Sequence, residues 1–208
     1  MNNNIINFYL KANNLKNVIR TGWKEVGISS ERIESVAEHV FGKMVLAMAL
    51  ESENNLSLDM NKVFKMLVIS ELEKINLDKE YTPTNNVSVE DRKAKAIEVV
   101  SNITDGLIKQ EEMISLLNEY YAKETNEAKF SNNVGKIESD LQAKIYDLNG
   151  QFSLENALED AKNYGEELSS EIIPKIKNAS DGWIEYDRRY YADDKMFEDL
   201  SKDIQKLQ

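Results

Sequence analysis

The chemistry open to this chain centres on its single histidine, His39. With one histidine and no cysteine, the chain has no thiolate nucleophile and cannot build a zinc site from several histidine or cysteine ligands of its own. A Ser-His-Asp triad could formally use His39, but no nucleophile-elbow sequence accompanies it. Glycine-rich phosphate loops and calcium loops are also missing from the sequence. Oxygen-ligated magnesium or manganese stays open, because carboxylates are plentiful.

A second group of polar residues follows the most apolar run of the chain. Residues 63–69 are apolar almost all round, which predicts a helix in the middle of a domain, and Ser70, Glu71, Glu73 and Lys74 follow at once. A carboxylate in such a place needs a partner, a metal or water. Because residues three apart meet on a helix, we expect Lys74 or a backbone donor to satisfy Glu71, with a metal as the alternative.

Composition places the chain among acidic globular proteins. The sequence has 208 residues, 41% hydrophobic and 30% charged, with a formal net charge of -11 and a pI of about 4.8. We predict a single domain over residues 1–208. The negative charge argues against a nucleic-acid partner. The first twenty residues lack the pattern of a signal peptide and no apolar run reaches membrane-spanning length, so we expect a cytoplasmic protein that does not enter a membrane.

The elements that position these residues are predicted to be helices throughout. Two prolines and eight glycines leave helical stretches largely uninterrupted, and we find no convincing strand pattern. Ser29 or Ser30 is expected to cap the helix that carries His39, and Asp59 to cap the next. That first central helix has apolar residues at three- and four-residue spacing, the mark of a buried face with His39 beside it: Val36, Val40, Met44 and Ala47.

Other boundaries follow from turn and cap residues. A short first helix should lead into a turn at residues 21–23, and residues 78–87 read as a loop. Ser88, with Asp91 three residues on, resembles a capping box. We predict a long helix over residues 126–148 and an amphipathic closing helix over residues 193–207.

Five short motifs, in order, resemble the HD-domain phosphohydrolases of the 5'-deoxynucleotidase type. They are RTGW at 20–23, ESVAEH at 34–39, LVISELE at 67–73, NEAKF at 126–130 and DLQAKIY at 140–146. The resemblance covers residues 7–146, and we expect the helices of residues 153–208 to pack on this domain. It implies an all-α HD-like helical bundle, usually a homodimer, that hydrolyses nucleotide phosphomonoesters with a divalent metal.

The resemblance implies four metal ligands, of which this chain keeps few. The first histidine corresponds to His39. The His-Asp pair falls on Ser70 and Glu71, so its histidine is gone and its carboxylate is one methylene longer. The last aspartate falls on Gly135, which has no side chain. In this reading His39 and Glu71 are what is left of the metal site; a one-residue slip of the alignment would lose the metal carboxylate as well.

Two family carboxylates have become lysines. A glutamate three residues beyond the His-Asp pair falls on Lys74, so no catalytic residue is assigned with that role, and the aspartate of a following Gly-Asp falls on Lys79. Ammonium groups repel a cation. We therefore expect a folded member that is catalytically inactive and holds no metal cofactor, with His39 hydrogen-bonded.

Three alternatives stay open. The first is an active phosphohydrolase that binds manganese, cobalt or magnesium through His39 and nearby carboxylates, which are Glu38, Glu73 and Asp78. A second is a nucleotide- or phosphate-binding pseudoenzyme that uses Arg20, Trp23 and the two new lysines, Lys74 and Lys79, since arginine suits phosphate and tryptophan can stack; a core role for Trp23 is an equal alternative. A third is an interaction protein, acting through its acidic surface or a cluster of tyrosines and arginines at residues 186–191.

Overall fold

The computed structural model describes residues 2–76 and 88–208, and the fold in these ranges is all-α, as the sequence predicts. Their only strand-like pairing is an isolated antiparallel bridge between Ile19 and Ser35. The backbone packs as two compact units. The expectation that residues 1–208 act as a single domain stays a prediction.

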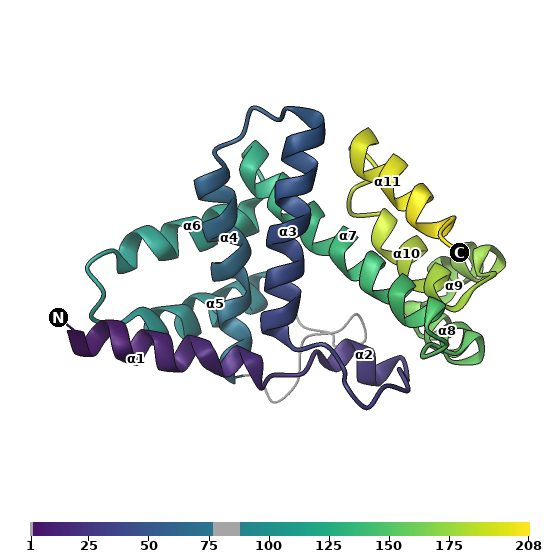
Figure 1. Cartoon of the computed structure of the whole chain (residues 1–208), viewed down its shortest axis with the longest axis horizontal. Coiled ribbons are helices and arrows are strands. Elements are labelled where there is room, and N and C mark those ends of the chain that lie inside the picture. Colours follow the sequence, from purple (N-terminus) through teal and green to yellow (C-terminus); the bar gives the residue numbers. More distant parts are fainter. Residues whose placement is uncertain (1, 77–87) are drawn as a thin grey trace. The chain divides into compact units, whose positions relative to one another are not determined.

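The first unit contains residues 2–20, 34–76 and 88–134 of the described chain. Its helices are α1 (Asn2–Asn13), α3 (Val36–Asn54), α4 (Met60–Leu72), α5 (Val89–Thr104), α6 (Gln110–Ala122) and the beginning of α7 (Asn126–Leu148), with 3-10 turns at Asn14–Lys16 and Glu73–Asn76. Helix α4 lies beside α3 and also contacts α5 and α6 (Figure 1). The apolar run at residues 63–69 is therefore central to this unit, as predicted.

The core of the first unit joins residues from several helices. Val63, Met66 and Leu67 of α4 are almost completely buried. A larger cluster packs around the ends of α3 and α4 and brings in α5 and α6: Leu15, Val36, Ile69, Leu72, Ala96, Val99, Val100, Ile103 and Leu117. Burial of such side chains is the main stabilising contribution to a helical fold of this kind.

The second unit contains residues 21–33 and 135–208. Its helices are α2 (Thr21–Glu25), the rest of α7, α8 (Leu154–Ala161), α9 (Glu166–Ile172), α10 (Ala179–Arg188) and α11 (Lys195–Gln205), with 3-10 turns at Lys162–Tyr164 and Ile173–Lys175. Helix α10 packs on α8 and α11. One core cluster surrounds Trp23 and draws on α2, α7, α8 and α10: Val26, Ile28, Ala143, Tyr146, Phe152, Ala157 and Ala179.

Several predicted helix boundaries are confirmed. Helix α7 has the predicted bounds. The Asp59 side chain accepts a hydrogen bond from the Lys62 amide, and Ser88 accepts one from the Asp91 amide, so both residues cap the helices that follow them. The closing helix α11 begins two residues later than predicted, after the cap residue Asp194.

Two predictions near the start of the chain are wrong. Residues 21–23 belong to helix α2 and form no turn. The cap of α3 is Ser35, because its hydroxyl accepts from the Glu38 amide while the Glu38 carboxylate accepts from the Ser35 amide at 2.9 Å. This reciprocal capping box satisfies two otherwise unpaired amides, which neither Ser29 nor Ser30 does.

The predicted loop at residues 78–87 lies outside the described residues, and Asp78 and Lys79 lie in it. Among the residues that are described, no helix is long and apolar enough to cross a membrane.

Candidate functional site

Charged residues of three HD-type motifs, together with two lysines that follow those motifs, form a cluster inside the first unit. All of these side chains except that of Lys74 are buried. They come from α3, from α4 and the turn after it, and from the segments beside the Ile19–Ser35 bridge. The members of this cluster, which we call the central charge cluster, are Arg20, Glu34, His39, Lys43, Glu71 and Lys74.

Local backbone structure brings Arg20 and Glu34 to His39. The Arg20 amide donates to the Glu34 carbonyl at 3.0 Å, and the Val36 amide donates to the Val18 carbonyl at 2.8 Å. These bonds fix the chain before α2 against the chain that enters α3. Since His39 lies one turn into α3, both side chains reach its ring from the helix entrance.

Arg20 determines which nitrogen of His39 carries a proton. Its Nη1 lies 3.1 Å from Glu34 Oε2 and 3.1 Å from His39 Nδ1. A guanidinium only donates hydrogen bonds, so Nδ1 must accept, and the proton of a neutral ring lies on Nε2. That nitrogen faces Glu71, whose Oε1 is 3.7 Å away. In this arrangement neither ring nitrogen offers a lone pair to a metal.

Two lysines hold the Glu71 carboxylate. Lys43 Nζ lies 2.6 Å from Oε1, and Lys74 Nζ lies 2.8 Å from Oε2. The Lys43 side chain is 1% exposed and that of Glu71 7%. Burial raises the pKa of Glu71, but the charges of Lys43 and Lys74 outweigh that effect and hold the pKa well below its usual value. Glu71 is therefore an ionised, buried carboxylate with two ammonium partners.

His39 is held neutral by the same surroundings. Its burial lowers the pKa of the imidazole well below the usual 6.5, and the positive charges of Arg20 and Lys43 lower it further, against an opposing effect of Glu71. The hydrogen-bonded histidine expected from the sequence is present. Its partner is an arginine, which the sequence did not indicate.

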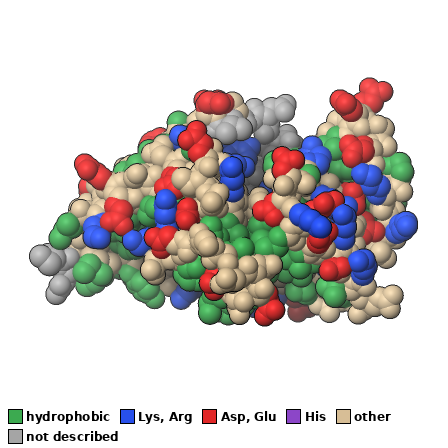
Figure 2. Space-filling model, turned by 90° about the horizontal axis from the view of Figure 1, so that it is seen from above, with side chains coloured by type: hydrophobic (Ala, Val, Ile, Leu, Met, Phe, Trp, Pro, Cys, Tyr) green, Lys and Arg blue, Asp and Glu red, His purple; other side chains and the backbone are tan. Residues whose placement is uncertain are grey.

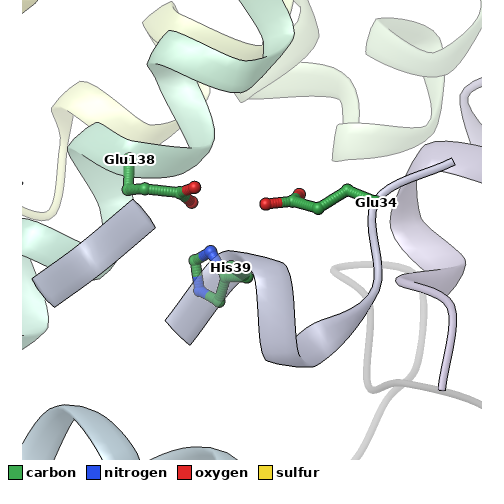
Figure 3. A group of neighbouring side chains, drawn as sticks. All are labelled: Glu34, His39 and Glu138. Carbon is green, nitrogen blue, oxygen red and sulfur yellow. The ribbon is translucent and has the colours of Figure 1, made fainter. Parts of the chain in front are cut away.

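The donor set is a poor match to the metal ligands that the resemblance implies. The Ser70 hydroxyl donates to the Leu67 carbonyl at 3.4 Å, and Gly135 has no side chain. Figure 3 shows the His39 ring on α3 and the Glu34 side chain reaching back from the segment before it; a ligand atom of each lies within 4.8 Å of the other. Glu138, also drawn there, belongs to the part of α7 in the second unit. Around His39, three cationic side chains oppose a bound cation.

Of the predicted binding residues, Arg20 belongs to the central charge cluster, and Trp23 and Lys79 are considered separately. Trp23 is completely buried in the second unit, where its ring packs 4.4 Å from that of Trp183 and edge-on to Tyr146 at 5.4 Å, measured between centroids. This burial agrees with the core reading of Trp23, and its role as a ligand-binding residue stays a prediction. Lys79 lies outside the described residues. The Arg20 guanidinium is committed to Glu34 and His39.

Sequence reasoning missed Lys43 and Glu34. The buried face of α3 contains His39 and Lys43 in place of the predicted Val40 and Met44, which are half-buried. The available signal was the four-residue spacing of His39, Lys43 and Ala47, which places all three on one face of a helix. Glu34 was part of a recognised motif without an assigned role.

Comparison with known proteins identifies the class to which this fold and cluster belong. The sequence profile of the HD domain family matches residues 12–177. The chain therefore belongs to the HD-domain family, and its relatives are of the 5'-deoxynucleotidase type. It is 30% identical over 160 residues to the 5'-deoxynucleotidase hdd1 of Schizosaccharomyces pombe, covering 74% of this chain and 77% of that protein. It is 29% identical over 152 residues to the 5'-deoxynucleotidase HDDC2 of Dictyostelium discoideum, covering 69% and 78%.

Solved structures support the fold. A conserved hypothetical protein from Pyrococcus furiosus aligns with a TM-score of 0.63 at 20% identity, over 97% of this chain and 99% of that one. A predicted metal-dependent phosphohydrolase from Magnetospirillum magnetotacticum aligns with a TM-score of 0.57 at 18% identity, over 98% and 94%. At these identities the alignments establish the helical architecture alone.

Proposed function

We propose that this chain is a non-catalytic member of the HD-domain family, in which lysine side chains occupy the carboxylate that a metal would need. The observation that carries the proposal is the pair of contacts to Glu71, with Lys43 on one oxygen and Lys74 on the other. Both oxygens already have a cationic partner within the protein.

The charge balance of the central charge cluster supports this reading. Arg20, Lys43 and Lys74 are positive, Glu34 and Glu71 are negative, and His39 is neutral, which leaves the cluster with a net positive charge. At an effective dielectric constant of about 20, one ammonium group about 4 Å from a divalent ion costs about 8 kcal/mol. Before Glu71 could act as a ligand, a metal would have to displace the Lys43 ammonium from its carboxylate and move that charge away from the ion.

A positively charged cluster is suited to an anion. We infer a binding role for this protein, and the first compounds to test are deoxynucleoside 5'-monophosphates, because the relatives named above are 5'-deoxynucleotidases. Lys74 is the member of the cluster with some exposed side chain, 16%, and is the residue we expect a phosphate group to reach.

Phosphate release tests the catalytic part of the proposal. Each deoxynucleoside 5'-monophosphate is incubated at high protein concentration with manganese, cobalt or magnesium, beside an active relative as positive control. We expect no release above background, and a rise in melting temperature with the nucleotide that binds. Metal-dependent release that disappears in His39→Ala would overturn the proposal, and no thermal shift with any nucleotide would remove the binding role.

One observation favours a second candidate, an active divalent-metal-dependent phosphohydrolase. Ligand atoms of Glu34 and His39 lie within 4.8 Å of one another, and Glu71 lies 3.7 Å from His39. Such a metal would need Arg20 to leave His39 and Lys43 to leave Glu71. Glu38 is a weak substitute because its carboxylate caps α3. Saturable activation by manganese, lost in both Glu34→Gln and His39→Ala, would select this candidate.

A homodimer, a cytoplasmic location and the absence of a nucleic-acid partner stay predictions. The last is supported by the formal net charge of -11 and by the face shown in Figure 2, where acidic and basic side chains lie interspersed. A phosphate backbone needs a basic surface to bind.

A further inference from the structure

The second unit contains a buried carboxylate that lies outside the central charge cluster. Asp140, on the part of α7 that belongs to this unit, is completely buried. Its Oδ2 accepts a hydrogen bond from the Tyr191 hydroxyl at 2.5 Å, and Tyr191 lies in the turn between α10 and α11. Its Oδ1 is buried and has no hydrogen-bond partner among the described residues. A buried carboxylate with one unpaired oxygen is costly when it is ionised.

The nearest cations are already paired with other carboxylates. Lys136, one turn earlier on α7, places its Nζ 2.8 Å from Oδ1 of Asp187, which is itself buried on α10. Arg188 donates from its Nη1 to Glu185. A negative charge on Asp140 would therefore lack a cation of its own and would meet the like charge of Asp187.

These surroundings favour the neutral acid. Burial raises the pKa of Asp140 well above its usual 3.8, and the charge of Asp187 raises it further. The hydrogen bond from Tyr191 and the positive charges of Lys136 and Arg188 lower the pKa, but they do not outweigh the first two effects. The charged and titratable groups that act on Asp140 thus come from α7, from α10 and from the turn after it.

The bond to Asp140 attaches a pair of helices to α7, and all three lie in the second unit (Figure 1). The Tyr191 ring packs on Phe197 of α11, with 6.3 Å between the ring centroids. Arg188 of α10 donates to the Ser201 hydroxyl of α11 from Nε at 3.2 Å and from Nη2 at 3.1 Å. Because α10 and α11 are joined in this way, an ionised Asp140 can gain water only if the pair separates locally from α7.

We propose that Asp140 is a proton-dependent latch, which docks the α10–α11 pair on α7 as the neutral acid and favours local opening of that contact when it ionises. The docked state holds a proton that the opened state releases, because Asp140 regains its usual pKa of 3.8 in water. Opening therefore becomes more favourable by up to about tenfold per pH unit above about pH 4, until the docked carboxyl itself ionises.

Hydrogen exchange of the α11 amides, followed by NMR, tests this proposal in the full-length protein. Protection factors report local opening, and they already correct for the intrinsic effect of pH on exchange. Between pH 5 and pH 8 we expect the factors of α11 to fall by up to about tenfold per pH unit over part of the range. Asp140→Asn cannot ionise and should remove this decrease. The matched control is Asp199→Asn, which changes an exposed carboxylate of α11 and should keep it.

A third variant tests the source of the effect. Asp187→Asn removes the repelling charge and frees Lys136 to pair with Asp140, so the decrease should end at a lower pH. Circular dichroism verifies that each variant is folded; if Asp140→Asn is not, the carbon-13 shift of the Asp140 carboxyl in the unmodified protein decides. Titration of that carboxyl near pH 4 would overturn the latch. So would protection of α11 that is independent of pH in the unmodified protein, or a decrease that persists in Asp140→Asn.

Discussion

The Lys43 ammonium lies 2.6 Å from the Glu71 carboxylate, and both side chains are buried within the first unit. The change in the free energy of unfolding on mutating such a pair depends on whether one partner or both are replaced. Removing one partner leaves the other charge buried without compensation, whereas replacing both with apolar groups can be nearly neutral. In this HD-domain chain, the pair puts a protein cation beside the carboxylate that the sequence resemblance predicts at a metal-ligand position.

Replacing Lys43 should therefore destabilise the protein strongly. We expect Lys43→Met to lower the free energy of unfolding by about 3–5 kcal/mol, measured by urea denaturation at pH 7. The matched control is Lys65→Met, because Lys65 makes an ion pair of similar length, 2.7 Å, with Glu112 at the exposed surface; losing that pair should change the free energy of unfolding far less, because water screens it. Equal effects of the two variants would contradict the buried pair.

The double variant Lys43→Met with Glu71→Leu extends that test. Because it removes both charges, it should recover most of the stability that the single variant loses. A double variant that is less stable than Lys43→Met would mean that Glu71 is stabilised mainly by other groups.

Glu73 should make stability depend on pH. Burial raises its pKa to about 7 from 4.5, and its carboxylate accepts a hydrogen bond from the Tyr121 hydroxyl at 2.9 Å. The folded state then holds a proton that the unfolded chain releases, so this contribution is present below about pH 4.5 and is lost as the pH rises through about 7. Its full size is on the order of 3 kcal/mol.

Comparison with Glu73→Gln isolates this contribution. The unfolding free energy of the unmodified protein, relative to that of Glu73→Gln, should fall between pH 5 and pH 8. A constant difference across this range would show that Glu73 has an ordinary pKa.

His39 should stay neutral well below its usual pKa. Because the chain has one histidine, its ring nitrogens give a single set of signals in a long-range proton–nitrogen NMR spectrum. We expect the tautomer with the proton on Nε2, with no protonation of Nδ1 at pH 6. Since the unfolded chain takes up that proton near pH 6.5 and the folded state does not, the contribution of His39 to stability is lost as the pH falls. A doubly protonated ring at pH 6 would contradict the bond from Arg20.

Trp23 should behave as a core residue. Its complete burial predicts that Trp23→Ala lowers the free energy of unfolding by about 3–5 kcal/mol, whereas the exposed Phe41 tolerates the same change within about 0.5 kcal/mol. Urea denaturation of the two variants gives the comparison. Unchanged stability with a lost nucleotide-induced thermal shift would instead support the predicted ligand-binding role of Trp23.

Much of the helical framework could be predicted because its signals are local. Asp59 and Ser88 cap helices through contacts three residues away, and the bounds of α7 follow from a residue pattern and from the Asn-Gly that ends it. Glu71, near the end of α4, and Lys74, in the 3-10 turn that continues it, meet because they are three residues apart along the helical path. The sequence analysis missed Ser35 as a cap, although Ser35 followed by Glu38 is the spacing of a capping box.

The rest of the central charge cluster depends on contacts between distant segments. Lys43 pairs with a residue of another helix, and Arg20 reaches His39 because the Ile19–Ser35 bridge aligns two separate segments. The spacing of His39, Lys43 and Ala47 places Lys43 on the buried face of α3, but nothing in the sequence identifies the distant partner of Lys43 or of Arg20. From sequence alone, a lysine on the half-apolar helix α3 is expected to face solvent. In the structure, the way α3 packs places Lys43 on its buried face.

The most direct measurement is the metal content of the purified full-length protein, followed by a manganese titration monitored by calorimetry. Because Lys43 and Lys74 already hold Glu71 and Arg20 already holds His39, we predict less than stoichiometric metal before and after soaking, and no saturable heat of manganese binding. An active relative measured in parallel should bind metal under the same conditions. One tightly bound divalent ion per chain, lost in His39→Ala, would contradict the account and restore a metal-dependent phosphohydrolase.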